Sequence, residues 1–259
     1  MLYRFIDDNG TFIARGAHRF CWYVPLTNPE GSLLSAIGPN LSGDIKKDND
    51  HFLTVPAGIE DMRSSPLCRR EFFIQAGSRT YRLSEGPVLR QETGLLYQKL
   101  FKRIGPCEAE ILNFVAPGRA AEVMRIVVRN RSRRAVAITP TSFIPMYGRS
   151  EKNLRDHRHV SSLLNRIELN PYGIFLKPTM IFDEKGHRLN RTIYYCQGYE
   201  AEGIKPEGQF PTLDLFYGQG NILHPDAIEK ITAPVSKKDP CFAGKEACAL
   251  SRRAMAARP

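Results

Sequence analysis

The chain has 259 residues, a formal net charge of +10 at pH 7 and a hydrophobic fraction of 42%. This length allows one large domain or two small ones, with enough apolar residues to build a substantial core. No apolar run approaches the roughly 18 residues that a membrane span needs, and the first residues alternate like a strand instead of forming a basic and then apolar leader. We therefore expect a globular cytoplasmic protein with no membrane partner.

Cysteine usage is consistent with this compartment. The six cysteines are scattered, without the two-residue spacing of a zinc knuckle or a redox motif. Their even number would allow disulfides, but a chain of this size does not need such cross-links to fold. We therefore expect reduced thiols.

The positive charge makes nucleic acid a partner to consider. Residues 233–259 hold six cations against two anions, and the other basic residues are spread along the chain and mixed with acidic ones. The sequence contains no helix-turn-helix or RNP motif. A basic nucleic-acid-binding β domain is therefore kept only as a second alternative.

The first residues predict a β-hairpin. Residues 2–6 and 11–14 are short apolar and aromatic runs, and residues 7–10 between them contain Asn-Gly, the strongest short hairpin signal. Period-2 or β-rich runs then recur along the chain, at residues 71–76, 80–83, 94–101, 108–115, 122–130, 135–144, 172–182 and 191–199. This pattern predicts an all-β fold, a large antiparallel β-sandwich.

Three segments break the pattern. Residues 22–66 hold five prolines and few alternating runs, so we expect long irregular connections there and not a sheet. Residues 151–167 contain apolar side chains at helical spacing, but we favour a loop to about residue 158 followed by a strand. The end of the chain is small and basic, so we expect a β-sandwich domain over residues 1–231 and a disordered tail over residues 232–259.

Residues 147–167 are the most informative part of the chain. They hold five cations, two anions and two histidines beside an apolar run, with a single glycine. Such a cluster is either a solvated charged loop or the wall of a pocket for a ligand rich in hydroxyl groups or phosphate. Spacing alone favours the solvated loop.

Four phrases of the sequence, taken in order, resemble a known family. They are FIDDNGTFI near the start, YVPLTNPEG at residues 23–31, GDIKKDNDHFLTVPAGIEDMRSS at residues 43–65 and ITPTSFIPMYGRSEKNLRDHRHVSSLL at residues 138–164. They are similar to the N-terminal domain of the cellobiose-phosphorylase-like glycoside phosphorylases, once called glycosyltransferase family 36. The likeness is greatest to the 1,2-β-oligoglucan phosphorylase branch and extends to about residue 225.

The resemblance implies a β-supersandwich of the galactose-mutarotase-like type, followed in the family by a helical linker, an (α/α)6 catalytic barrel and a small C-terminal β domain. The family reaction is an inverting phosphorolysis, in which inorganic phosphate attacks a terminal β-glucosyl unit and α-glucose 1-phosphate leaves. Because phosphate is the nucleophile, one protein carboxylate is enough. The resemblance places that aspartic acid in the barrel, so it implies no catalytic residue, cofactor or metal in this chain.

Seven residues match the family's cationic run and are our candidates for a loop that reaches the substrate cleft. Arginine forks suit phosphate and sugar hydroxyls because planar donors form paired hydrogen bonds. The alternative is an interdomain salt-bridge network that only docks the barrel, and both interpretations stay open. The seven are Arg149, Asn153, Arg155, Asp156, His157, Arg158 and His159.

A second candidate loop is the block GDIK at residues 43–46. Asp44 and Lys46 are candidates to bind sugar, with a simple turn as the alternative. Trp22 and Tyr23 are candidates to stack on a glucose ring, although aromatic residues beside proline more often anchor a loop on the core. The His-x-His pair of the cationic run has no clear third ligand, so we expect no metal site.

The likeness has limits that shape the interpretation. Residues 61–73 depart from the family's asparagine- and arginine-rich pattern through Pro66 and Cys68, and the last residues do not resemble the linker. We expect the N-terminal fragment of a phosphorylase for β-linked gluco-oligosaccharides, inactive alone and docking the (α/α)6 domain in cis or in trans, with a homodimer as a further partner. The alternative is a stand-alone carbohydrate-binding or interaction module with no catalysis.

Overall fold

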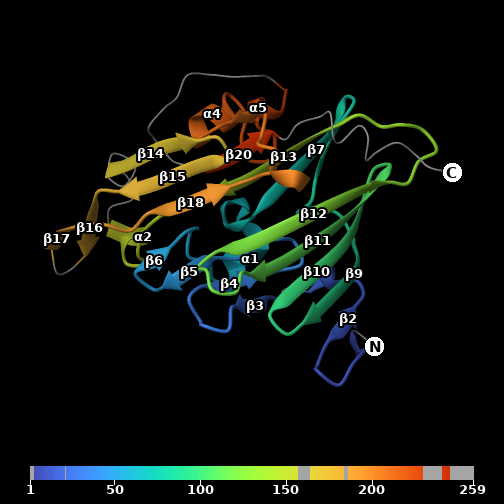
Figure 1. Ribbon diagram of the computed structural model, residues 1–259, viewed down its shortest axis with the longest axis horizontal. Coiled ribbons are helices and arrows are strands. Elements are labelled where there is room, and N and C mark those ends of the chain that lie inside the picture. The colour runs from blue at the N-terminus through green and yellow to red at the C-terminus, as the bar shows by residue number, and fades with distance from the viewer. Residues whose placement is uncertain (1–2, 21, 157–163, 184–185, 230–240, 246–259) are drawn as a thin grey trace.

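The computed structural model describes residues 3–20, 22–156, 164–183, 186–229 and 241–245. All strand pairs in this part of the chain are antiparallel, and its helices are short. Figure 1 shows the long strands β9 to β12 as one twisted sheet, with the other sheets stacked beside it. The predicted all-β fold of stacked antiparallel sheets is confirmed.

The largest sheet has six strands in the order β1-β2-β9-β10-β11-β12. Its side chains alternate between the two faces, as in β11, where every second residue from Cys107 to Val115 is buried. Such alternation is what a sheet with one face on the core requires. The strands are β1 (Tyr3–Phe5), β2 (Phe12–Ala14), β9 (Val88–Gly94), β10 (Tyr97–Ile104), β11 (Cys107–Val115) and β12 (Glu122–Asn130).

Residues 22–66 contain a four-stranded sheet, so the expectation of irregular connections is wrong. The sheet has the order β3-β4-β5-β6. Pro25 lies in β3 at the edge of the sheet, where a missing N–H on the free side removes no ladder bond. Pro29 and Pro39 lie in the connections between strands. The strands are β3 (Val24–Thr27), β4 (Leu34–Ile37), β5 (Ile45–Asp48) and β6 (His51–Phe52).

A five-stranded sheet has the order β19-β20-β13-β7-β8. Its strand β20 lies within residues 232–259, so the expected disorder of the tail does not extend to these five residues. They pair with β13 through the register Thr141↔Lys245 to Pro145↔Cys241. The strands are β7 (Glu71–Ala76), β8 (Arg79–Arg82), β13 (Ile138–Pro145), β19 (Gly208–Gln209) and β20 (Cys241–Lys245).

Two small sheets follow the cationic segment. One has three strands in the order β14-β15-β18, and the other is the hairpin of β16 and β17. The strand predicted over residues 172–182 is therefore divided into β15 and β16. The strands are β14 (Asn165–Asn170), β15 (Gly173–Pro178), β16 (Met180–Asp183), β17 (Gly186–Leu189) and β18 (Tyr194–Gln197).

The helices are single turns or little more. Residues 153–156 form α2, so the loop expected to about residue 158 is wrong at this point, and β14 begins only at residue 165. None of the helices in the described residues is long and apolar enough to cross a membrane. The elements are α1 (Ile59–Ser64), α2 (Asn153–Asp156), α4 (Leu213–Tyr217), α5 (Asp226–Glu229) and the 3-10 turns η1 (Ala17–Arg19), η2 (Pro66–Cys68) and η3 (Ala201–Gly203).

The main core lies between the six-stranded sheet and the strands β3 to β5, β7 and β13. Leu26, Leu100 and Ile111 are among its fully or almost fully buried side chains. The neighbouring residues of β7 point to opposite sides, because Phe72 belongs to this core and Phe73 packs with α4 in a second cluster. A third cluster joins β15 and β18 to the end of β13. These three clusters hold in place the strands that carry the candidate site.

Candidate functional site

The two loops predicted to carry the site meet on the β5–β6 hairpin. The N–H of Phe52 donates to the carbonyl of Arg149 at 2.9 Å, and the N–H of Arg149 donates back to Phe52 at 3.2 Å. The N–H of Glu151 donates to the carbonyl of Asn49 at 3.0 Å. Lys46 pairs with Phe52 in the register of β5 and β6. The segment at residues 147–151 therefore lies against the hairpin that carries Lys46.

Arg149 and Asn153 are buried residues that stabilise the contact between this segment and the hairpin. Each is only 3% exposed. The Nη2 of Arg149 donates to Oδ1 of Asn165 at 3.2 Å, and the hydroxyl of Ser150 donates to Oδ1 of Asn153 at 3.0 Å. Burial lowers the pKa of the Arg149 guanidinium. These two residues therefore position the segment and do not form its open rim.

A buried phenol completes the inner layer. Tyr194, in β18, is 7% exposed, and its hydroxyl has no hydrogen-bond partner among the residues described. Burial raises its pKa, and the negative charge of Asp48 acts in the same direction while Arg149 opposes it. Tyr194 of β18 therefore lies near Asp48 of β5 and near Arg149, which follows β13, and Figure 1 shows β18 on the same side of the molecule as β5 and β6.

The rim is formed by the β5–β6 hairpin. The Nδ1 of His51 lies 2.6 Å from Oδ1 of Asp48, and both side chains are partly exposed. Partial burial acts to raise the pKa of Asp48, but the hydrogen bonds from His51 and from the N–H of Asp50 bring it below its ordinary value. The Nζ of Lys46 donates to Oδ1 of Asn49 at 2.8 Å. The rim thus offers a carboxylate, an imidazole and an ammonium group at an accessible position.

The remaining sequence candidates divide into three groups. Asp44 accepts the N–H of Ala57, 13 residues further along the chain, at 3.0 Å through Oδ2, so it connects the residues before β5 to the loop before α1, and its predicted role in sugar binding stays a prediction. Arg155 and Asp156 lie in α2, and for these two residues the structure describes only the backbone. The other three, His157, Arg158 and His159, lie outside the described residues. Their predicted role in substrate binding stays a prediction.

A buried ion pair fixes the turn before Lys46. Arg70 Nε lies 2.6 Å from Glu122 Oε1, and the two side chains are 1% and 5% exposed. The Nη1 of Arg70 donates to the carbonyl of Gly43 at 3.1 Å, and Ser35 donates its hydroxyl to Glu122. Arg70 therefore connects β12 to the GDIK block. It lies inside the stretch that departs from the family pattern, and sequence analysis gave it no role.

Lys102 is a second buried charged residue to which sequence analysis gave no role. Lys102 is 2% exposed and donates its Nζ to the carbonyl of Leu83 at 2.5 Å. Burial lowers its pKa to about 8, while the nearby Glu71 acts to raise it. Burial raises the pKa of the Glu71 carboxyl, which accepts hydrogen bonds from Ser84. Alternation along the strand could have predicted this burial, because Lys102 lies on the inward-facing side of β10 between buried Leu100 and Ile104.

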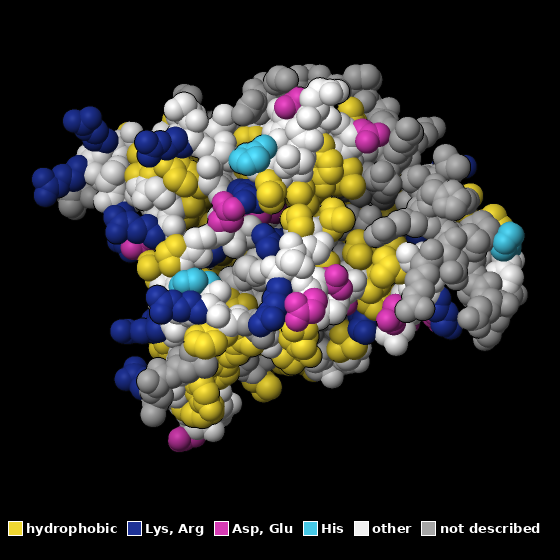
Figure 2. All heavy atoms as spheres, turned by 180° about the vertical axis from the view of Figure 1, so that it is seen from behind, with side chains coloured by type: hydrophobic (Ala, Val, Ile, Leu, Met, Phe, Trp, Pro, Cys, Tyr) yellow, Lys and Arg dark blue, Asp and Glu magenta, His cyan; other side chains and the backbone are white. Residues whose placement is uncertain are grey.

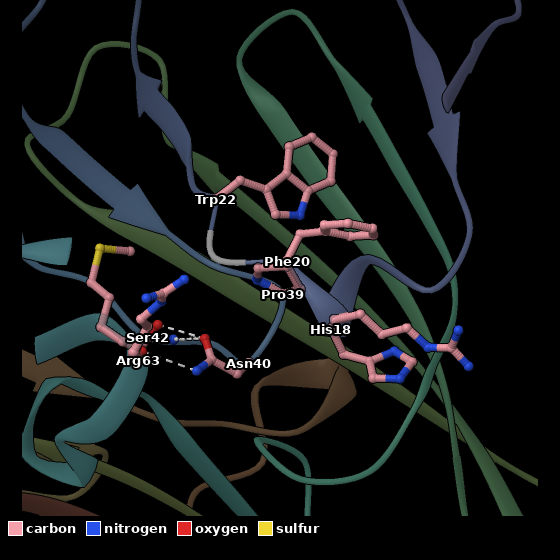
Figure 3. Close-up of a pocket in the computed structure, with 9 residues that line it drawn as sticks. His18, Phe20, Trp22, Pro39, Asn40, Ser42 and Arg63 are labelled. Carbon is pink, nitrogen blue, oxygen red and sulfur yellow. Dashed lines mark hydrogen bonds between the residues drawn. The ribbon is translucent and has the colours of Figure 1, made fainter. Parts of the chain in front are cut away.

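A pocket of about 190 Å³ lies away from this rim, and Trp22 lines it. In Figure 3, Trp22 and Phe20 lie on one side of the pocket, and Asn40, Ser42 and Arg63 on the other. The indole packs against Phe12 with ring centroids 5.8 Å apart. Tyr23 is not part of the lining. Trp22 is therefore a loop anchor that also lines a cavity.

The described residues contain no group of three or more His, Cys, Asp or Glu side chains that could hold a metal ion. Cys68, Cys107 and Cys196 are buried, and burial raises the pKa of Cys196 to about 12. On the face shown in Figure 2, basic side chains gather along one edge and mix with acidic ones elsewhere.

No protein-family model matches the chain, and no curated protein is significantly similar to it in sequence.

Proposed function

We propose that this β-sandwich serves an inverting glycoside phosphorylase for β-linked gluco-oligosaccharides as its non-catalytic N-terminal domain. In this role the β5–β6 hairpin and the cationic segment supply loops to the substrate cleft and a docking surface. The catalytic acid and the site for inorganic phosphate belong to an (α/α)6 domain, in cis or in trans. This chain binds and positions, and it performs no chemical step.

One observation carries the proposal. Two of the four phrases that resemble the family meet in space through the paired backbone of Phe52 and Arg149. Between them they present Lys46, His51 and Asp48 at an accessible rim. Ammonium and imidazole donors next to a carboxylate acceptor match the hydroxyl groups of a sugar, each of which both donates and accepts.

The buried residues beneath the rim support the docking role in the proposal. Arg149 and Asn153 are buried and bind within the domain, so a ligand meets the rim that they support and not their own polar groups. Loops positioned by a rigid scaffold commonly carry binding residues. The substrate-binding role of Arg155, Arg158 and their neighbours rests on the sequence resemblance alone.

The test is a titration of the purified chain with β-1,2-linked gluco-oligosaccharides, followed by calorimetry over a salt series. We expect binding that changes little between low and high salt, because the ligand is neutral. Mixing the chain with the same glucan and phosphate should release no glucose 1-phosphate. Release of glucose 1-phosphate would contradict the assignment of catalysis to another domain.

A duplex DNA titration under the same conditions separates the nucleic-acid alternative. Binding to a phosphate backbone falls steeply with added salt, because counterions are released. DNA binding with that salt dependence and no sugar binding would replace our proposal. Sugar binding by the chain, together with neighbouring DNA that encodes no catalytic domain, would identify the stand-alone module.

A further inference from the structure

The pocket of Figure 3 shares no residue with the rim described above, so its ligand is inferred independently of the proposed function. It is formed by η1, the chain just before β3, the turn between β4 and β5, and α1. Its volume of about 190 Å³ is below the range of sites for drug-sized molecules, which begins near 300 Å³. The space suits one ring with a small substituent.

Hydrogen-bond donors dominate the lining. The Nε1 of Trp22 is buried and has no hydrogen-bond partner among the described residues. The Nδ1 of His18 accepts the N–H of Val88 at 3.1 Å, so the neutral ring carries its proton on Nε2 and can donate it. Arg19 and Arg63 are exposed guanidinium groups at the pocket wall, and Arg63 Nη1 also lies 3.4 Å from Oε1 of the exposed Glu60. A ligand in this pocket therefore meets donors and positive charge.

Acceptors are scarce in the same lining. Asn40 is the main candidate, but its Oδ1 accepts the N–H of Ser42 at 3.2 Å and its Nδ2 donates to the carbonyl of Met62 at 3.1 Å. The lining includes no carboxylate. A neutral sugar carries no charge that would interact with the guanidinium groups of the wall. An anion that only accepts, such as a phosphate group, fits the donors that are present.

Two aromatic faces complete the site. Phe20 is 47% exposed, and the indole of Trp22 is held in place by Phe12. A ligand ring stacks on the indole with little loss of entropy, because Trp22 is already packed against Phe12. The turn beneath them is preformed as well, since Leu41 is fully buried at a φ of 62°.

We propose that this pocket binds a phosphomonoester carried on a single ring. The ring stacks against Trp22 and Phe20, the phosphate binds the guanidinium group of Arg63, and the indole N–H donates to a ligand oxygen. Glucose 6-phosphate carries its phosphate on one ring, whereas AMP adds a base to the ribose that carries the phosphate, and the test compares the two.

The chain offers a direct reporter, because Trp22 is its single tryptophan. Titration of the full chain with glucose 6-phosphate or AMP should change the tryptophan fluorescence and release heat in calorimetry. We expect at least one of the two to bind about 10-fold more tightly than inorganic phosphate or glucose alone. The tighter of the two identifies the source of the ligand.

Two variants test the assigned contacts. Trp22→Phe keeps a ring and removes the indole N–H, and Arg63→Gln removes one cation from the exposed wall. Each should weaken binding of the ring phosphate about 5-fold or more in calorimetry. The matched controls Tyr23→Phe and Arg79→Gln, outside the pocket, should stay within about twofold. Thermal melting of every variant checks that the fold is intact.

Three results would overturn the proposal. They are equal affinity for phosphate and ring phosphate, unchanged affinity in both Trp22→Phe and Arg63→Gln, or much tighter binding of a single-stranded oligonucleotide than of AMP. The last would mean that the surface follows a nucleic-acid backbone instead of holding one ring.

Discussion

Arg70 and Glu122 face each other in the core through two charge-assisted hydrogen bonds, Nε to Oε1 at 2.6 Å and Nη2 to Oε2 at 2.7 Å. Because Arg70 also binds the carbonyl of Gly43, this pair connects the six-stranded sheet to the turn that precedes Lys46. The geometry of the rim therefore depends on a buried pair that lies outside it.

Replacement of Arg70 by alanine should destabilise the protein by about 3–5 kcal/mol, since it leaves Glu122 buried without its partner. Urea denaturation of the variant measures this loss. The exposed pair of Arg131 and Glu108 is the matched control, and Arg131→Ala should cost less than about 1 kcal/mol. A loss below about 1 kcal/mol for Arg70→Ala would show that the pair does not hold the turn.

Gly43 should not tolerate a side chain. Its φ is +130°, and a Cβ placed there would lie 2.0 Å from the carbonyl oxygen of Ala36. Gly43→Ala should therefore cost about 3 kcal/mol or more, because both the backbone conformation and the contact are violated. Gly77→Ala is the control, since Gly77 also has a positive φ but open space around it. That variant should cost roughly 1–2 kcal/mol, and equal losses in the two would contradict the close approach.

The free energy of unfolding should increase with pH because of Lys102. Its folded pKa of about 8 lies below its ordinary value of 10.5. Between these values the unfolded chain keeps a proton that the folded chain has lost, so the free energy of unfolding rises with pH, by up to about 1.4 kcal/mol per unit. Below the folded pKa both states are protonated and the destabilisation by burial is fully present.

The measurement compares the wild type with Lys102→Met across this pH window. The difference in unfolding free energy between them isolates the Lys102 contribution, because the other titrating groups cancel. Lys99→Met, on the opposite face of the same strand, is the matched lysine-to-methionine control. A flat difference for Lys102→Met would mean that the ammonium group is solvated in the folded protein.

Arg149 should act through stability and not through direct ligand contact. Arg149→Ala removes a buried donor to Asn165 and should lower the free energy of unfolding by about 2–4 kcal/mol. Lys152→Ala, nearby and exposed, should change it by less than about 0.5 kcal/mol. A fully stable Arg149→Ala protein with lost sugar binding would instead identify Arg149 as a ligand contact.

Much of the sheet structure could be predicted from the alternation of side chains. The boundaries of β7 and β12 agree with those predicted from period-2 or β-rich runs, and the first hairpin follows from Asn9-Gly10. The sheet over residues 22–66 could not, because proline content does not reveal that β3 is an edge strand. The same limit applies to β20, whose pairing with β13 depends on residues far away in sequence.

The site was predictable only in part. Local composition identified the segments around Lys46 and Arg149 as polar and cationic. Their contact through Phe52 is a tertiary feature, and so is the burial of Arg149, which depends on β14. The pairing of Arg70 with Glu122 is also nonlocal, and no spacing rule in the sequence indicates it.

The most direct test of the proposed binding surface is a map of backbone amide shifts during titration with a β-1,2-linked glucotriose. We expect the largest changes at Lys46, Asn49, His51 and Glu151. We also expect about 10-fold weaker binding for Lys46→Ala, while Lys47→Ala on the same strand stays unchanged. A saturating titration with no shifts at these four amides, or shifts confined to another face, would contradict the account.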